Sequence, residues 1–299
     1  MQPSVPILRT STDENLRETA CHGNPAYPFR YYLENVWEFD FHCIDWHWHE
    51  ELEFIYVADG ALTASVVGED VYLPQGWGMF INSRAVHRFT AKAAVKMPNF
   101  LFLPTLLAAE ETLVYQRYVR PVLAGAPLYV PLDPGSAWQA EVLHIMRAIF
   151  AMHAQGKPNE LQVVRRLLEM WELLAASLRL RPVAAEAQRG GDQARLQVML
   201  QYIRDHYAEP VTLRQVANAA FISRNSALEI FRKGIGQSPI AYMIRYRLQR
   251  AAQLLRATEK AVSIIAYETG FSNPGYFCRK FKEAFGMSPN AYRKLRRVL

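Results

Sequence analysis

The sequence repeats a twelve-residue pattern near its C-terminal end. Residues 231–242 are FRKGIGQSPIAY and residues 281–292 are FKEAFGMSPNAY, so that Phe, Gly, Ser, Pro, Ala and Tyr recur at an offset of 50 residues. A fixed-period repeat is typical of one supersecondary unit used more than once. Each copy follows a short predicted helix, a turn and a second, basic helix, which predicts two helix-turn-helix units. Two such units on one chain predict a protein that binds two neighbouring stretches of the DNA major groove.

Charge divides the chain near the same place. Residues 194–299 carry 18 lysines and arginines against 6 acidic residues, a net charge of +12. The preceding 193 residues carry 16 basic residues against 22 acidic ones, a net charge of −6. A basic block fused to an acidic one indicates a module that binds a polyanion beside a module with another task.

The acidic part changes character along its length. Residues 29–89 favour short strands bounded by turns, such as 52–57, which predicts a small sandwich or barrel. Residues 137–154 and 159–180 instead place apolar residues at helical spacing, which predicts a helical hairpin. The apolar faces of these helices either pack on their own domain or form a self-association surface.

We therefore expect an α+β protein of two domains: residues 1–181, a small, polar linker at 182–193, and an all-α domain at 194–299. Thr212 and Ser223 are expected to cap the two helices of the first helix-turn-helix unit, and Ser263 the first helix of the second. Pro239 suits the first turn of a long helix that runs to about Thr258. About 20 helical residues span about 30 Å, which is close to the roughly 34–36 Å between major-groove readers on one face of DNA.

Other features narrow the class of protein. The three cysteines, Cys21, Cys43 and Cys278, form no C-x-x-C pair, so we expect neither a disulfide framework nor a cysteine zinc site. We expect no signal peptide, no membrane span and a cytoplasmic location. No nucleophile arrangement, P-loop or dinucleotide fingerprint is evident, so no catalytic residue is predicted.

The C-terminal hundred residues resemble the AraC/XylS family of transcription regulators. The second unit carries the closest match, at Ile265-Ala266, Gly270-Phe271, Tyr276-Phe277, Phe281-Lys282 and Ser288-Pro289. The resemblance implies an all-α DNA-binding domain whose two recognition helices, joined by a long helix, enter adjacent major grooves.

In the second unit, the predicted DNA-binding residues are Asn273, Gly275, Tyr276, Arg279 and Lys282. Arg279 is the main candidate for reading a base, because an arginine can donate two hydrogen bonds to guanine O6 and N7. The alternative for Arg279 is a phosphate contact or surface charge. Lys282 is expected to contact phosphate without sequence preference.

The first unit departs from the family pattern, which usually has an arginine at the position of Glu229. A carboxylate that faces phosphates is unfavourable, but it can accept a hydrogen bond from cytosine N4. The first recognition helix therefore either reads a cytosine through Glu229 or depends on Arg224, Asn225 and Arg232, with Ser223 at its start.

The N-terminal half resembles the cupin-like sensor domain found in this family. His47, His49, Glu53 and Gly60 have the spacing of the first cupin motif, and His87 stands at the place of the histidine of the second. The second motif is otherwise degraded. Alternation along a strand allows the side chains of His47 and His49 to point to the same side.

Three interpretations of these histidines remain open. With Glu53 they could bind Fe, Mn or Zn; together with the neighbouring Trp48 they could line an effector pocket; or they could serve barrel packing alone. No cofactor is predicted firmly.

The resulting hypothesis is a homodimeric regulator that binds double-stranded DNA and responds to a small-molecule effector in its cupin-like barrel. Dimerisation is expected through the helices at 137–180. The alternative is a cupin metalloenzyme that carries a DNA-binding appendage.

Overall fold

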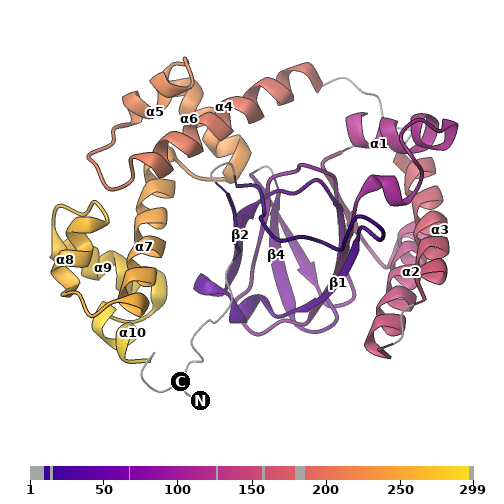
Figure 1. Ribbon diagram of the computed structural model, residues 1–299, viewed down its shortest axis with the longest axis horizontal. Helices are drawn as coiled ribbons and strands as arrows, with labels where there is room; N and C mark the ends of the chain where they lie inside the picture. Colours follow the sequence, from indigo (N-terminus) through magenta and orange to yellow (C-terminus); the bar gives the residue numbers. More distant parts are fainter. Residues whose placement is uncertain are drawn as a thin grey trace. The chain divides into compact units, whose positions relative to one another are not determined.

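A computed structural model of the chain describes residues 10–13, 16–66, 68–125, 127–156, 159–178 and 186–295. Its contacts divide the chain into two compact units that meet at Gly190–Gly191. The first unit contains all the β-strands found in the described residues, and the second is helical. Figure 1 colours the first unit indigo to magenta and the second orange to yellow.

The first unit is built on two antiparallel sheets. The five-stranded sheet has the order β1-β8-β3-β6-β9 and the four-stranded sheet the order β2-β7-β4-β5. The strands are β1 (Phe29–Glu34), β2 (Cys43–His47), β3 (Leu52–Tyr56), β4 (Ala61–Val66), β5 (Glu69–Pro74), β6 (Gly78–Ile81), β7 (His87–Thr90), β8 (Met97–Phe102) and β9 (Tyr129–Leu132). This arrangement agrees with the predicted cupin-like barrel.

The alternation of side chains along β3 sets up two apolar cores. Leu52 and Phe54 pack in a core that includes the helices α2 (Ala137–Ala154) and α3 (Glu160–Leu178). Ile55 points the other way, into a core shared with residues of the four-stranded sheet. Because successive side chains of a strand alternate, Glu53 faces the same side as Ile55, which is the space between the two sheets.

The helical hairpin covers the outer face of the five-stranded sheet. Its helices α2 and α3 lie side by side (Figure 1) and bury Leu143, Met146, Leu167 and Trp171 in the core that holds Phe54. Helix α2 has the bounds predicted from the sequence. The first unit also has short helical segments at η1 (Val36–Glu38), η2 (Asp40–His42), η3 (Pro104–Leu106), η4 (Tyr115–Val119) and α1 (Arg120–Gly125).

The second unit is a run of helices that starts earlier than expected. Helix α4 spans Glu186–Asp205, so residues 186–193 of the predicted linker are helical, and its residues 182–185 lie outside the described residues. Gly190 and Gly191 lie within the predicted linker, and glycine is a poor helix former. The helix nevertheless continues through both positions.

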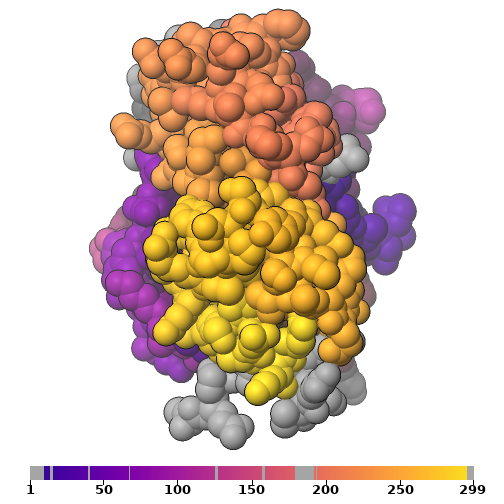
Figure 2. All heavy atoms as spheres, turned by 90° about the vertical axis from the view of Figure 1, so that its left-hand side faces the viewer, coloured from indigo at the N-terminus to yellow at the C-terminus, as the bar shows by residue number. Residues whose placement is uncertain are grey.

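The remaining helices form the two predicted helix-turn-helix units. They are α5 (Leu213–Ala219), α6 (Arg224–Ile235), α7 (Pro239–Ala257), α8 (Val262–Glu268), α9 (Pro274–Phe285) and α10 (Pro289–Leu295). The long helix α7 contacts the helices of both units. In the space-filling view the first of these units is orange and the second yellow, one above the other (Figure 2).

The repeated sequence encodes the same local structure twice. Phe231 and Phe281 are fully buried. Gly236 and Gly286 end α6 and α9 with φ of 65° and 71°, a left-handed conformation that glycine adopts without strain. The following Ser238 and Ser288 cap the next helices by accepting hydrogen bonds from backbone N–H groups, at 3.2 Å each. A proline then starts each helix.

Two details of the helix ends can be compared with the sequence. The predicted cap of α5 is confirmed, because Thr212 and Gln215 form a capping box. The expectation that Ser263 caps the next short helix was wrong, because α8 begins at Val262 after Ala261 and has no side-chain cap. Within the described residues, no helix combines the length and hydrophobicity needed to span a membrane.

Candidate functional sites

The space between the two sheets contains a cluster of buried ionisable side chains. His47 and His87 pair directly across strands β2 and β7, and their ring centroids lie 4.1 Å apart. His49 follows β2, and Glu53 comes from β3 of the opposite sheet. All four residues are at most 4% exposed. The structure therefore brings together four of the five residues predicted to bind an effector.

The backbone fixes the orientation of the three imidazoles. Each Nδ1 lies at hydrogen-bond distance from a backbone carbonyl: 2.7 Å for His47 to Asp45, 3.1 Å for His49 to Glu51, and 2.8 Å for His87 to Ala85. A carbonyl only accepts, so each Nδ1 carries the proton. In the neutral ring each Nε2 then presents a lone pair.

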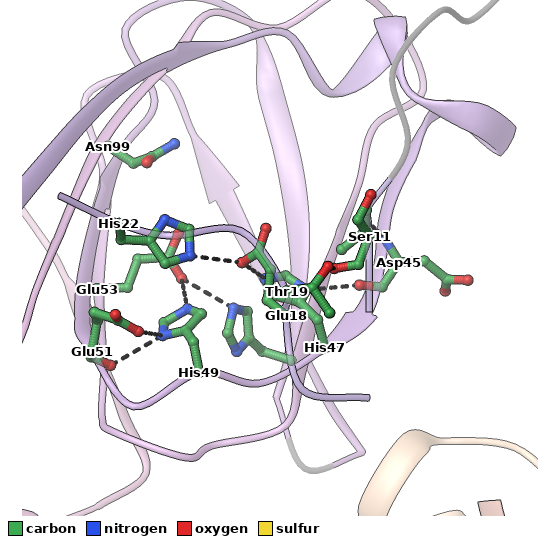
Figure 3. A network of polar contacts seen from close by, with 12 residues as sticks. Ser11, Glu18, Thr19, His22, Asp45, His47, His49, Glu51, Glu53 and Asn99 are labelled. Carbon is green, nitrogen blue, oxygen red and sulfur yellow. Dashed lines mark hydrogen bonds and ion pairs between the residues drawn. The ribbon is translucent and has the colours of Figure 1, made fainter. Parts of the chain in front are cut away.

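The Nε2 atoms of His49 and His87 lie near the carboxylate of Glu53, and Figure 3 shows His49 beside Glu53. Its Oε2 lies 3.0 Å from His87 Nε2 and 3.5 Å from His49 Nε2. These are the distances of ion pairs, and Glu53 Oε2, His49 Nε2 and His87 Nε2 are buried without a hydrogen-bond partner among the described residues. Buried polar atoms left in this state cost free energy, about 1–3 kcal/mol each.

Burial strongly affects ionisation in this cluster. Burial, followed by the proximity of His87, lowers the pKa of His47 to about 3, so its ring is neutral at pH 7. Burial by itself would raise the pKa of Glu53, but the interactions with His49 and His87 outweigh it and hold the pKa below its usual range. The cluster therefore holds a carboxylate beside at least one neutral imidazole.

The same geometry suits a divalent metal ion. The ligand atoms of His47, His49 and His87 all lie within 4.8 Å of one another. Ligand atoms that share an ion at about 2.0–2.2 Å are separated by up to about 4.4 Å, so small side-chain movements would close the set. Metal-bound histidines usually donate their other N–H to a carbonyl or carboxylate, as these three do. The residues present therefore fit a metal.

Sequence reasoning missed several polar residues that extend the cluster. His22 lies with its ring centroid 5.6 Å from that of His49, and its Nε2 is 3.1 Å from Glu18 Oε2. On β8, Asn99 is fully buried and donates to Glu34 at 2.6 Å. No motif or periodicity marks these positions, because they are brought in by strand pairing and by the segment before β1.

Trp48 differs from the other predicted effector residues. It is only partly buried, and its indole ring lies under the guanidinium of Arg17, 5.8 Å from ring centroid to Cζ. Its backbone binds residues 16 and 18. Trp48 thus contacts the chain segment before β1, whereas its neighbours His47 and His49 are buried in the cluster.

In the second helix-turn-helix unit, α9 presents the predicted DNA-binding side chains on one face. Gly275, Arg279 and Lys282 are exposed, with the helical spacing i, i+4, i+7. Tyr276 packs partly on the core, and the guanidinium of Arg279 lies 5.4 Å from its ring centroid. Asn273 caps the helix by accepting from the backbone N–H of Tyr276 at 2.9 Å, which commits its side-chain oxygen to the helix start.

In the first helix-turn-helix unit, α6 exposes Arg224, Asn225, Glu229 and Arg232. Ser223 caps the helix through the backbone N–H of Ser226 at 3.1 Å. The carboxylate of Glu229 pairs with Lys233 at 2.6 Å, and this lysine lowers the pKa of Glu229. This ion pair within α6 partly neutralises the carboxylate of Glu229, which was expected to be unfavourable beside DNA phosphates.

Comparison with known proteins covers both units. Residues 216–295 match the family described as "Helix-turn-helix domain", and residues 42–99 match the family described as "Cupin domain". An uncharacterised HTH-type transcriptional regulator of Bacillus subtilis, YdeC, is 27% identical over 289 residues, which cover 95% of this chain and 97% of the relative. The HTH-type transcriptional activator RhaS of Escherichia coli is 31% identical over 164 residues, 53% of this chain and 58% of RhaS.

Solved structures resemble the C-terminal unit. An AraC-type regulator from Chromobacterium violaceum is 28% identical and covers 36% of this chain and 96% of its own, with a TM-score of 0.34. The DNA-binding domain of AdpA, solved with a target DNA, is also 28% identical and covers 35% and 94%, again with a TM-score of 0.34. From its matching domains and its relatives, the chain is a DNA-binding transcriptional regulator similar to those of the AraC family, with a cupin domain ahead of its two helix-turn-helix units.

Proposed function

We propose that the chain is a one-component regulator in which the cupin unit takes a small polar effector at the cluster of His47, His49, Glu53 and His87. The observation that supports this is the set of buried Nε2 and Oε2 atoms without hydrogen-bond partners among the described residues. A polar ligand that satisfied these atoms would remove their desolvation cost. Binding at this site would change the affinity for DNA if the two DNA-binding states of the chain hold the effector with different affinities.

The DNA-binding part of the proposal assigns α6 and α9 to adjacent major grooves. Helix α7, which joins the two helix-turn-helix units, has 19 residues and is therefore about 28 Å long. That length is comparable to one turn of B-DNA, about 34 Å. Arg279 on α9 is assigned to a base edge and Lys282 to phosphate. On α6 the arginines Arg224 and Arg232 take the main role, because Glu229 is paired with Lys233.

Self-association is assigned to the exposed side of the helical hairpin. Leu161 and Leu168 stand seven residues apart on α3, hence on one face, and are 79% and 42% exposed. Exposed leucines with this spacing on a surface helix are typical of a helix–helix interface. A homodimer would bring four recognition helices to tandem DNA elements.

We assign the cluster to sensing rather than to catalysis, since the relatives of known class are transcriptional regulators. The test is operator binding in the presence of a panel of small polar compounds, for wild type and for Glu53→Gln. A compound that shifts operator affinity at least fivefold in the wild type and leaves Glu53→Gln unresponsive would support the proposal. Glu110→Gln, on an exposed position of the same unit, is the matched control and should respond like the wild type. Equal responses in all three proteins would contradict the assignment of the site.

A further inference from the structure

A short segment ahead of β1 is docked along the strand that carries the histidines. Trp48 donates its backbone N–H to Leu16 at 2.9 Å, and Glu18 donates to Trp48 at 2.8 Å. These two bonds form a parallel bridge between Arg17 and Trp48. Leu16 is 2% exposed, so the segment also inserts an apolar side chain into the unit. The backbone of residue 18 is thereby fixed beside residues 47–49.

Glu18 reaches from this segment into the cluster (Figure 3). Its Oε2 lies 3.9 Å from His47 Nε2 and 3.1 Å from His22 Nε2, and its side chain is 17% exposed. His22 in turn lies 3.0 Å, through Nδ1, from the hydroxyl of Tyr32. Glu18 therefore contacts His47, whereas Glu53 contacts His49 and His87.

Two carboxylates flank the three imidazoles, whose ligand atoms lie within 4.8 Å of one another. Glu53 lies beside the Nε2 atoms of His49 and His87, and Glu18 lies beside that of His47. Each ring has its Nδ1 on a backbone carbonyl, so that Nε2 is the atom on the side of the carboxylates. Imidazole nitrogens together with carboxylate oxygens form a ligand set that suits a divalent first-row transition-metal ion.

We propose that Glu18 is the second carboxylate of this metal site, held in place by His22, so that the ion ties residues 16–22 to the barrel. Neither Glu18 nor His22 belongs to the cupin motif, and both lie before the first strand. Metal and segment then stabilise each other by linkage: an ion that binds the docked segment better than the undocked one shifts the segment toward docking. The inference concerns the cluster given above as the effector site, and in that respect it rests on the proposed function.

The first test is a Co²⁺ titration of metal-stripped, full-length protein, followed by competition with Zn²⁺. The d–d absorption of Co²⁺ reports its ligands without any activity assay. Glu18→Gln should weaken binding roughly tenfold to a hundredfold and change the Co²⁺ spectrum. Glu110→Gln is the control and should match the wild type, and Glu18→Asp should recover part of the affinity. Wild-type affinity and spectrum in Glu18→Gln, or no metal binding by the wild type, would overturn the proposal.

The second test uses wild-type protein, so it does not depend on the folding of a variant. Arg17 is exposed and immediately precedes Glu18, so trypsin cleavage after Arg17 reports undocking of the segment. Adding Zn²⁺ should slow this cleavage at least fivefold, while cleavage at exposed arginines of the helical unit, such as Arg224, should not change. Unchanged cleavage after Arg17 at saturating metal would overturn the coupling. Operator binding, measured separately, decides the proposed function independently of either result.

Discussion

Arg279 is the side chain whose position most directly implies contact with a base. It is exposed on α9, one turn from Gly275, and its guanidinium lies 5.4 Å from the ring centroid of Tyr276, which limits its freedom. We expect Arg279→Ala to weaken specific DNA binding by about 1–3 kcal/mol and to relax the preference at one base pair. Affinity measurements on operators with single base-pair changes provide the check.

Lys282 offers the matched comparison on the same helix. Because a phosphate contact carries no sequence information, Lys282→Ala should weaken binding to all sequences alike and reduce the salt slope by about one. If Arg279→Ala behaved in the same uniform way, Arg279 would be a phosphate contact and not a base reader.

Glu34 yields a prediction about pH. The residue as a whole is half-buried, but burial of its carboxyl and the proximity of Glu53 raise its pKa from 4.5 to about 8. A folded-state pKa above the unfolded one gives stability that is complete below about pH 4.5 and is lost as the pH rises through about 8. Glu34→Gln should therefore be more stable than the wild type at pH 8.5, by roughly 2–4 kcal/mol at about 1.4 kcal/mol per pKa unit, and similar to it at pH 4.5.

Tryptophan fluorescence during urea unfolding measures this difference. All six tryptophans lie between residues 37 and 171, so the signal comes from the cupin unit alone. Glu110→Gln, at an exposed position, should follow the wild type at both pH values. Curves of stability against pH that run parallel for wild type and Glu34→Gln would show that folding does not raise the pKa of Glu34.

At the level of helices and turns, the two helix-turn-helix units differ at one backbone position. Gly270 ends α8 with φ of +83°, and the next residue, Phe271, donates to Ala266 at 2.9 Å. After α5 the same place is held by Phe221, with φ of +55° and the residue 97% exposed. A left-handed conformation costs a non-glycine residue about 1–2 kcal/mol.

Phe221→Gly should therefore stabilise the C-terminal unit, by roughly 0.5–1 kcal/mol once the greater entropy of glycine in the unfolded chain is included. Gly270→Ala should do the opposite, because a Cβ there would lie 2.5 Å from the carbonyl oxygen of Tyr207 as well as adopt the strained φ. Far-UV circular dichroism during thermal unfolding follows both variants. Destabilisation by Phe221→Gly would indicate that the exposed ring contributes to folding.

The elements predicted correctly are those whose sequences carry strong local signals. The F-x-x-x-x-G-x-S-P repeat encodes a buried ring, a left-handed helix end and the cap of the next helix, so α6, α7 and α9 follow from it. The bounds of α2 follow from its apolar spacing. Local signals gave the wrong result at two positions. Ser263 was expected to cap a helix but lies inside α8, and Gly190 was expected in a linker but lies inside α4.

The candidate site was only partly predictable for a similar reason. His47, His49, Glu53 and His87 follow from motif spacing, because strands from both sheets of one barrel place them in its interior. Glu18 joins them through pairing of its backbone with Trp48, 30 residues away, and the segment around it has neither periodicity nor a motif. Long-range pairing of this kind leaves no mark in local sequence.

For the molecule as a whole, the proposed dimer makes α3 an interface. Leu161→Glu combined with Leu168→Glu should convert a dimer to a monomer, because charges would replace exposed apolar side chains on one face. Tyr72→Glu, at a residue 65% exposed on β5, is the control and should remain dimeric. Sedimentation velocity distinguishes the two states. A wild type that sediments as a monomer, or a double variant that stays dimeric, would place the interface elsewhere.

Loss of the dimer should also weaken binding to tandem DNA elements by at least tenfold. Two linked binding modules raise each other's effective concentration on a tandem site, and separate monomers lose that gain. Binding to a single isolated element should change little, which separates this effect from misfolding.

The most direct test of the account is selection of bound DNA from a random library by the full-length protein. Two helix-turn-helix units joined by a helix about 28 Å long should recover two short sequence elements about 10 base pairs apart on one face of the duplex. Arg279→Ala should blur one of these elements and leave the other intact. Recovery of a single short element, or no enrichment at all, would contradict a regulator that reads DNA with both α6 and α9.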